Sequence, residues 1–430
     1  MNNISSKPPK YRWVILSVFM FITLTVEIQW LTHAAVARPA EVFYRGQYNA
    51  DSFFNIDFLA MSYMVLFLIM SFPASYVIDT YGIKKALRFG AALAGVSGIG
   101  KAIFAKSFLG VVISQVGLSV AQPFIINAVT ALTVRWFPLE ERGMAAGFST
   151  LAQYIGIIIA MLVTPHMVGS DPSLPGYGTG FENMLMIYGI ITLVSAVTVF
   201  IFIREKPDGY VLSDPEERFG FRKGVFSILK NRDMQITLFL FLIGLGIFNA
   251  ISSMTDSISE YAGVRDSDGL IGGIMLIGGI IGAIIIPVLS DKYRKRKLFL
   301  VIGIAGMVPG VAGLSFAGQL GFDHVITYSI LLVSAFILGF FIMSAGPVAF
   351  QYAAEVSYPA HESASQGMLL WIGQLSGMVF VAAMSMERNK YIGPVLVLFS
   401  LLAIFLLVAV FFLKESQMMS VLKEKDNIRL

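Results

Sequence analysis

The chain alternates between long apolar runs and short segments rich in charged or turn-forming residues. Most runs reach the length of about 20 residues that an α-helix needs to cross the hydrocarbon core of a bilayer. The alternating pattern of membrane β-barrel strands is absent, and in lipid only helices and closed barrels satisfy their backbone groups. We therefore predict an all-α membrane protein with twelve transmembrane helices, at residues 13–37, 55–78, 86–105, 108–134, 143–168, 183–204, 235–258, 269–289, 298–318, 325–352, 365–385 and 391–413.

The positions of Lys and Arg predict the orientation. If the N-terminus is cytoplasmic, most of the 31 Lys and Arg residues lie in the two termini and in the loops on the same side. Cytoplasmic loops of membrane proteins carry this excess. We therefore expect a multi-pass protein of the cell membrane with both termini in the cytoplasm.

The two halves of the chain share a loop pattern. Asp79 after the second predicted helix and Asp291 after the eighth are each followed by a Tyr two residues later and by basic residues five and six residues later. The two copies lie nearly half the chain apart, which indicates a duplicated unit. We predict two pseudo-symmetric six-helix bundles, 1–204 and 235–430 with a cytoplasmic tail, joined by a cytoplasmic linker at 205–234 that mixes Pro, Gly and both charge signs.

Each copy of this loop pattern has two interpretations. It can be an ordinary basic cytoplasmic loop, or it can be a latch in which an acid at a helix end pairs with bases across the loop. The Asp favours the latch, because topology requires only Lys and Arg. The first copy, Asp79-Thr-Tyr-Gly82-Ile-Lys84-Lys85, resembles the loop 2–3 motif of the major facilitator superfamily, whereas the second has Arg294 in place of the Gly. The gating candidates are Asp79, Lys84, Lys85, Arg135, Asp291 and Glu355.

Polar residues inside the spans concentrate on predicted helices 1, 4, 7 and 10, the first of each three-helix group. Such residues are costly in lipid and usually face the interior of the bundle. Hydrogen bonding between helices is the alternative explanation, above all for the serines. The residues concerned are Glu27, Gln29, Trp30 and His33, then Gln115, Ser119, Gln122 and Asn127, then Asn249, Ser252, Ser253 and Asp256, and finally Ser344, Gln351 and Glu355.

Composition narrows the functional classes. The chain has 430 residues, of which 56% are hydrophobic and 13% charged, and its formal charge is +4. These values exclude a soluble enzyme and a disordered chain, and we expect no nucleic-acid partner. The chain has no Cys and only four His, so we expect no metal site and no cofactor. The glycines of predicted helix 8 lack a following Gly-Lys-Ser/Thr and predict close helix packing, not nucleotide binding.

Three stretches of the first half, Glu27 to Leu31, Ile56 to Asp79 and Ser119 to Phe137, together with Leu338 to Gln374 in the second, resemble one branch of that superfamily. This branch is the feline leukaemia virus subgroup C receptor-related transporters of choline and haem. The resemblance implies a carrier whose site uses a Trp on helix 1 and Gln on helices 4 and 11, which are Trp30, Gln122 and Gln374 here. An indole face attracts a quaternary ammonium. Glu27 and Asn249 depart from the family pattern, and Gln351 is a further polar position. The substrate candidates are therefore Glu27, Trp30, Gln122, Asn249, Gln351 and Gln374.

The departures change the expected substrate. Asn249 replaces an aromatic residue of that family, and Glu27 stands where a small residue is expected. No Lys or Arg lies in the middle of a neighbouring span, and Lys101 is expected to extend its long stem to the membrane interface. Glu27 then has two stable states, either protonated or ionised beside a cationic substrate.

We therefore predict a monomeric carrier that moves a small polar organic amine by alternating access, with a proton as a candidate coupling ion in a symport. The alternatives are uptake of an amino acid, of a metal-chelating amino-carboxylate or of haem. A receptor that does not transport, or a channel, is a further alternative.

Overall fold

A computed structural model of the chain describes residues 10–48, 55–169, 175–207, 220–264, 266 and 269–416. Linker residues 208–219, the tail at 417–430 and the side chains of Asp57, Asp256 and residues 385–389 lie outside the described part. In the described ranges the chain is helical with no strand, and twelve helical stretches are long and apolar enough to cross a membrane. This number confirms the sequence prediction.

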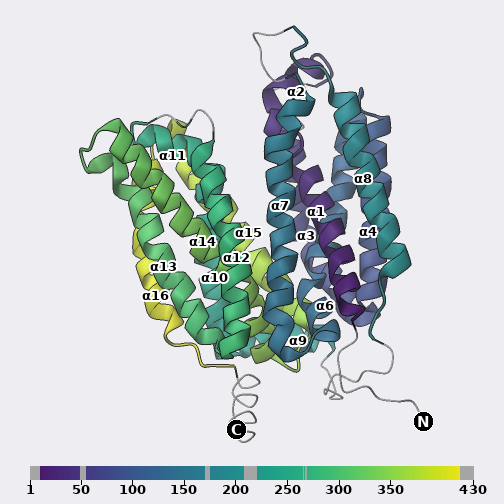
Figure 1. Ribbon diagram of the computed structural model, residues 1–430, viewed down its shortest axis with the longest axis vertical. Helices are drawn as coiled ribbons and strands as arrows, with labels where there is room; N and C mark the ends of the chain where they lie inside the picture. The colour runs from purple at the N-terminus through teal and green to yellow at the C-terminus, as the bar shows by residue number, and fades with distance from the viewer. Residues whose placement is uncertain are drawn as a thin grey trace, which may run out of the picture. The chain divides into compact units, whose positions relative to one another are not determined.

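The chain divides into two compact units, and Figure 1 shows the helices of each. Unit 1 consists of residues 1–137 and 149–215, and unit 2 consists of residues 138–148 and 216–430. The helices of unit 1 are α1 (Arg12–Leu31), α2 (Ala37–Phe43), α3 (Ile56–Tyr81), α4 (Ile83–Ile103), α5 (Phe108–Ile126), α6 (Ala128–Trp136), most of α7 (Arg142–Met167) and α8 (Phe181–Phe202). Those of unit 2 are α9 (Phe221–Lys230), α10 (Arg232–Ser253), α11 (Thr255–Tyr261), α12 (Leu270–Tyr293), α13 (Arg296–Phe316), α14 (His324–Ser357), α15 (Glu362–Asn389) and α16 (Ile392–Val410), with the first turns of α7.

In unit 1, the fourth span is interrupted where α5 meets α6. Pro123 lies inside α5, and Asn127 separates the two helices. The Asn127 side chain donates to the Ser71 carbonyl oxygen at 3.1 Å and to the hydroxyl oxygens of Ser71 and Ser75 at 3.0 and 3.1 Å. These bonds join the junction to α3, so Asn127 serves as a hydrogen-bonding link between helices, the alternative that the sequence left open.

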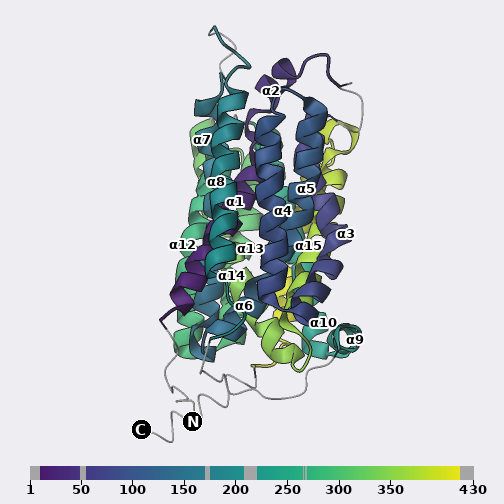
Figure 2. The same cartoon turned by 90° about the vertical axis from the view of Figure 1, so that its right-hand side faces the viewer.

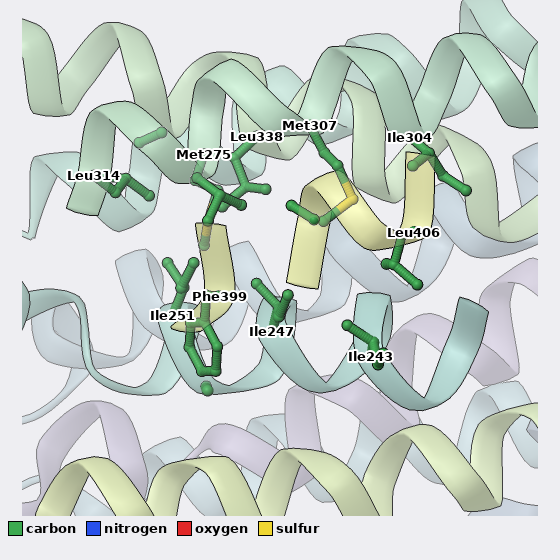
Figure 3. Packing of buried hydrophobic residues seen from close by; sticks show 14 of the residues in the cluster. Ile243, Ile247, Ile251, Met275, Ile304, Met307, Leu314, Leu338, Phe399 and Leu406 are labelled. Carbon is green, nitrogen blue, oxygen red and sulfur yellow. The ribbon is translucent and has the colours of Figure 1, made fainter. Parts of the chain in front are cut away.

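In unit 2, α10 packs its buried face into an apolar core. Ile243, Ile247 and Ile251 recur every four residues, so they share one side of the helix. Figure 3 shows this stripe with Met275 of α12 and Phe399 of α16 in the same cluster. The core fixes the face of α10 that is turned away from Asn249.

The glycines of α12 allow close packing against α14. A Cβ atom at Gly278 or Gly282 would overlap the carbonyl oxygens of Phe336 and Phe340. Only a residue without a side chain permits this approach of two backbones. The structure therefore confirms the packing role predicted for the glycine-rich helix.

Candidate substrate site and gating clusters

Glu27 lies near the middle of the first span and is 2% exposed. Its carboxylate accepts one hydrogen bond, from the side-chain amide of Gln122 in α5, at 3.4 Å. Gly156 of α7 faces it, where a Cβ would lie 2.9 Å from the Cβ of Glu27. Within the described ranges, no Lys or Arg forms an ion pair with Glu27. The carboxylate is thus enclosed by α1, α5 and α7 with one neutral donor.

Aromatic side chains lie on the same helices and on α3 beside them. Trp30, one turn after Glu27, donates its indole N–H to the Ala60 carbonyl oxygen at 3.0 Å. Its ring stacks on Tyr63 of α3 with the centroids 6.1 Å apart and the planes at 24°. The hydroxyl groups of Tyr63 and Tyr154 lie within electrostatic reach of Glu27. One acid and three aromatic rings therefore gather on three helices of unit 1.

Tyr63 supplies a free hydrogen-bonding group at this place. Its side chain is 1% exposed, and its hydroxyl has no hydrogen-bond partner in the part of the chain that the structure describes. A buried polar group without a partner costs about 1 to 3 kcal/mol. A ligand with a polar group would relieve that cost.

The expectation for Lys101 is wrong. Its side chain, on α4, does not extend to the membrane interface, because it is fully buried within unit 1. The ammonium group donates to the backbone and side-chain oxygens of Gln29 at 3.1 and 3.3 Å. Gln29 lies in the last turn of α1, where carbonyl oxygens without helical partners attract a cation. These two acceptors hold the Lys101 side chain inside unit 1.

The end of α1 is held by further bonds. Gln115 of α5 donates to the Leu59 carbonyl oxygen at 2.8 Å and to the Gln29 and Trp30 carbonyl oxygens at 3.4 Å each. His33, for which an interfacial position was one possibility, is buried and stacks on Phe181 at 6.1 Å. The backbone that carries Trp30 is therefore fixed from two neighbouring helices.

In unit 2, the structure joins two of the three substrate candidates. The Asn249 side-chain amide on α10 donates to the Gln374 side-chain oxygen on α15 at 3.3 Å. Gln351 on α14 is fully buried. Glu27, Trp30 and Gln122 belong to unit 1, so the six candidates form two groups, one in each unit.

The first loop copy has an acid that the sequence analysis did not select. Glu205, after α8, accepts hydrogen bonds from the backbone N–H groups of Ile83 and Lys84 at 3.2 and 2.9 Å. It also pairs with Arg135 at 2.6 Å. Gly82 links α3 and α4 with φ +92°, and Asp79 is 8% exposed. The carboxylate of Glu205 therefore binds the N-terminus of α4, the end that favours a negative charge.

The second loop copy forms a buried charged cluster in unit 2. Arg296 is fully buried and lies between the carboxylates of Asp291 at 2.5 Å and Glu355 at 3.1 Å. Asp291 also accepts from the backbone N–H groups of Gly143 and Met144, in the first turn of α7, at 3.3 and 2.6 Å. Arg294, where the first copy has a Gly, adopts φ +53°, so both loops have a residue of positive φ at this position.

The residues that the sequence analysis did not select are Tyr63, Tyr154, Glu205 and Arg296. Tyrosines are common in membrane spans, and no spacing rule relates Tyr63 or Tyr154 to a carboxylate on α1. Arg296 carried a signal, because it lies five residues after Asp291, one of the two spacings at which both loops have a basic residue. Glu205 carried none beyond its place at the end of the sixth span.

Comparisons with known proteins agree on a family and a fold. Residues 13–382 match the family model described as Major Facilitator Superfamily. The choline/ethanolamine transporter FLVCR1 of Mus musculus is 26% identical over 421 residues, which cover 89% of this chain and 71% of that protein. Solute carrier family 49 member A3 of Xenopus tropicalis is 25% identical, with 86% of this chain and 77% of that protein covered.

Solved structures show the same fold at low identity. The proton:xylose symporter XylE, bound to 6-bromo-6-deoxy-D-glucose, has a TM-score of 0.73 at 17% identity, covering 94% of this chain and 96% of that one. The transporter FucP in its outward conformation has a TM-score of 0.70 at 12% identity, covering 94% of this chain and all of that one. At these identities, the match establishes the arrangement of helices alone.

Proposed function

Because the chain belongs to the Major Facilitator Superfamily, and is thus a multi-pass membrane transporter and not an enzyme, we propose that its small-molecule substrate is an organic amine with at least one N–H bond. The observation that carries this proposal is Glu27, a buried carboxylate with one neutral hydrogen-bond donor. A substrate ammonium is the cation that this group lacks. The transporter then moves the amine by alternating access.

The chemistry of the surrounding groups supports an ammonium ligand. An ammonium with N–H bonds donates charge-assisted hydrogen bonds to a carboxylate, which are about twice as strong as neutral ones. The rings of Trp30 and Tyr63 offer π-faces, each worth about 0.5 to 2 kcal/mol to a cation. Gln122 and the Tyr63 hydroxyl then serve a hydroxyl or other polar group of the substrate.

Glu27 distinguishes primary from quaternary amines. The first relative transports choline or ethanolamine by its name. A quaternary ammonium such as choline has no N–H to donate to Glu27, and Asn249 in unit 2 is not aromatic. We expect a primary or secondary amine, with ethanolamine as the first compound to test. An amino acid, a metal-chelating amino-carboxylate and haem are the competing substrates, and a receptor or a channel is the competing class.

Glu27 also provides a route to proton coupling. A proton and an ammonium ion compete for the same carboxylate oxygens, so substrate binding releases a proton or waits for its release. Apparent affinity for the amine then weakens as the pH falls. Competition at Glu27 therefore favours exchange of the amine for a proton over the symport predicted from the sequence, because a symporter must bind proton and substrate together.

The experiment is uptake of labelled ethanolamine into proteoliposomes over a range of pH, with the parent protein and Glu27→Gln. We expect uptake by the parent and a pH dependence that Glu27→Gln flattens. The control is Glu182→Gln, the same substitution at an exposed acid of α8 that pairs with Lys106. Absence of amine uptake by a folded parent protein would refute the proposed substrate class.

The gating proposal concerns the two loop copies. We propose that Asp79, Lys84, Lys85 and Arg135 in unit 1, and Asp291 and Glu355 in unit 2, control the conformational equilibrium without touching substrate. Asp79→Asn should change the population of states in a fluorescence assay with little change in intrinsic affinity. We further propose a monomer in the cell membrane, with both termini in the cytoplasm.

A further inference from the structure

Helix α9 lies outside the membrane spans and is distinct from both groups of candidate residues. Its ten residues, Phe221–Lys230, are too few to cross a bilayer. In Figure 2 it is seen nearly end-on, whereas the long helices of unit 2 run close to vertical. Asn231 alone separates it from α10, a membrane span that begins at Arg232. The helix therefore lies across the end of a span, at the level of the membrane surface.

Specific contacts fix the orientation of α9. Gly224 and Ile228 are buried, and a Cβ atom at Gly224 would lie 3.5 Å from the Cβ of Ala360. At the corner between α9 and α10, the Asn231 side chain accepts from the Met234 N–H at 3.1 Å and donates to the Val356 carbonyl oxygen at 2.9 Å. One face of α9 is thus held against unit 2, and the opposite face points outward.

The outward face combines apolar and basic side chains. Phe226 is 56% exposed and Leu229 is 45% exposed. Arg222, Lys223 and Lys230 are exposed beside them, and α9 contains no acidic residue. A short amphipathic helix with large apolar residues and Lys or Arg is typical of segments that lie in the plane of a membrane interface.

We propose that α9 binds anionic phospholipid at the membrane surface. Phe226 and Leu229 enter the boundary between headgroups and acyl chains, while Arg222 and Lys230 bind headgroup phosphates. Because α9 directly precedes the span α10, the lipid that α9 binds belongs to the bilayer around α10. The excess of basic residues on this side places α9 at the cytoplasmic leaflet, where anionic lipids concentrate.

The absence of Cys from the sequence allows a direct test. Phe226→Cys is labelled with an environment-sensitive fluorophore and reconstituted in nanodiscs of phosphatidylcholine with or without phosphatidylglycerol. We expect a blue-shifted emission that brominated lipids quench, with stronger quenching by brominated phosphatidylglycerol. Lys206→Cys, at an exposed lysine after α8, is the matched control and should report water in both lipids.

Charge removal tests the headgroup preference. In the labelled protein, Arg222→Gln with Lys230→Gln should reduce the preference for phosphatidylglycerol, by about fivefold for each basic residue removed. Arg38→Gln with Lys206→Gln removes the same charge from exposed positions in unit 1 and should leave the preference unchanged. Melting temperature, measured on every variant, shows that the protein remains folded.

A label at position 226 that remains in water and is unquenched in both lipids would overturn the proposal. Burial of the label only after addition of a soluble protein would also overturn it, and would assign α9 to a protein partner. An equal preference for both lipids in the parent protein would refute the anionic-lipid part of the claim.

Discussion

Both units contain buried carboxylates, but the groups that bind these carboxylates differ. In unit 2, Asp291 and Glu355 share the Arg296 guanidinium at 2.5 and 3.1 Å, and Asp291 also accepts two backbone N–H groups. In unit 1, Glu27 receives one amide hydrogen bond of 3.4 Å. Lys101, the buried cation of unit 1, donates to the oxygens of Gln29.

The carboxylates of Asp291 and Glu355 are therefore structural, whereas that of Glu27 is available to a ligand. A buried ion remains in a protein when a counter-ion or several hydrogen bonds compensate for lost hydration. Asp291 and Glu355 meet this requirement through Arg296. Glu27 does not meet this requirement, so it is either protonated or ionised with a cation from outside the chain bound to it. For this reason we assign Glu27 to substrate binding.

The largest expected effect is loss of the cation in unit 2. Arg296→Met leaves Asp291 and Glu355 buried without a counter-ion, which typically costs about 3 to 5 kcal/mol of stability. The measurement is thermal unfolding in detergent or lipid. A triple variant that adds Asp291→Asn and Glu355→Gln should recover part of the loss. A melting temperature equal to that of the parent would show that the cluster is not structural.

An intermediate effect is expected at Trp30, whose ring stacks on Tyr63 in unit 1. Trp30→Ala should weaken amine binding by about 0.5 to 2 kcal/mol, because the π-face is lost. Trp30→Phe should retain part of the affinity. Trp13→Phe is the control for the loss of an indole elsewhere. Binding to Trp30→Ala at the parental affinity would remove Trp30 from the site.

The smallest effect is expected at Lys101. Lys101→Met removes a buried charge together with its desolvation cost, but leaves the side-chain oxygen of Gln29 without that donor, so we expect a net change of about 1 kcal/mol or less. Thermal unfolding beside Arg296→Met tests the contrast directly. A loss as large as that of Arg296→Met would mean that Lys101 has an anionic partner in the folded protein.

The sequence predicted the parts of the molecule that depend on local pattern. Twelve apolar runs give twelve spans, and the repeated Asp-to-basic spacing marks two loops that each have a residue of positive φ, Gly82 and Arg294. The prediction for Lys101 was wrong because a long stem beside an interface usually reaches water. The acceptors on Gln29 depend on how α1 packs against α4, which spacing along one helix does not reveal.

The electrostatic interaction of Tyr63 and Tyr154 with Glu27 depends on packing in the same way. Glu27 itself was visible in the sequence, because a carboxylate in an apolar run is rare. Its neighbours lie on α3, α5 and α7, and only the folded unit brings them together. The sequence also did not show that the second loop copy forms the buried ion pairs of Arg296, because this copy lacks the Gly of the first.

Contact between Glu27 and the ammonium group of the substrate is tested most directly by a binding cycle. Calorimetric titration of ethanolamine and choline, with the parent protein and Glu27→Gln, measures the cost of removing N–H bonds in the presence and absence of the carboxylate. We predict that the parent prefers ethanolamine by about tenfold, and that Glu27→Gln abolishes this preference. If Glu27→Gln retains the parental ratio of affinities, Glu27 does not bind the ammonium group and the central claim is wrong.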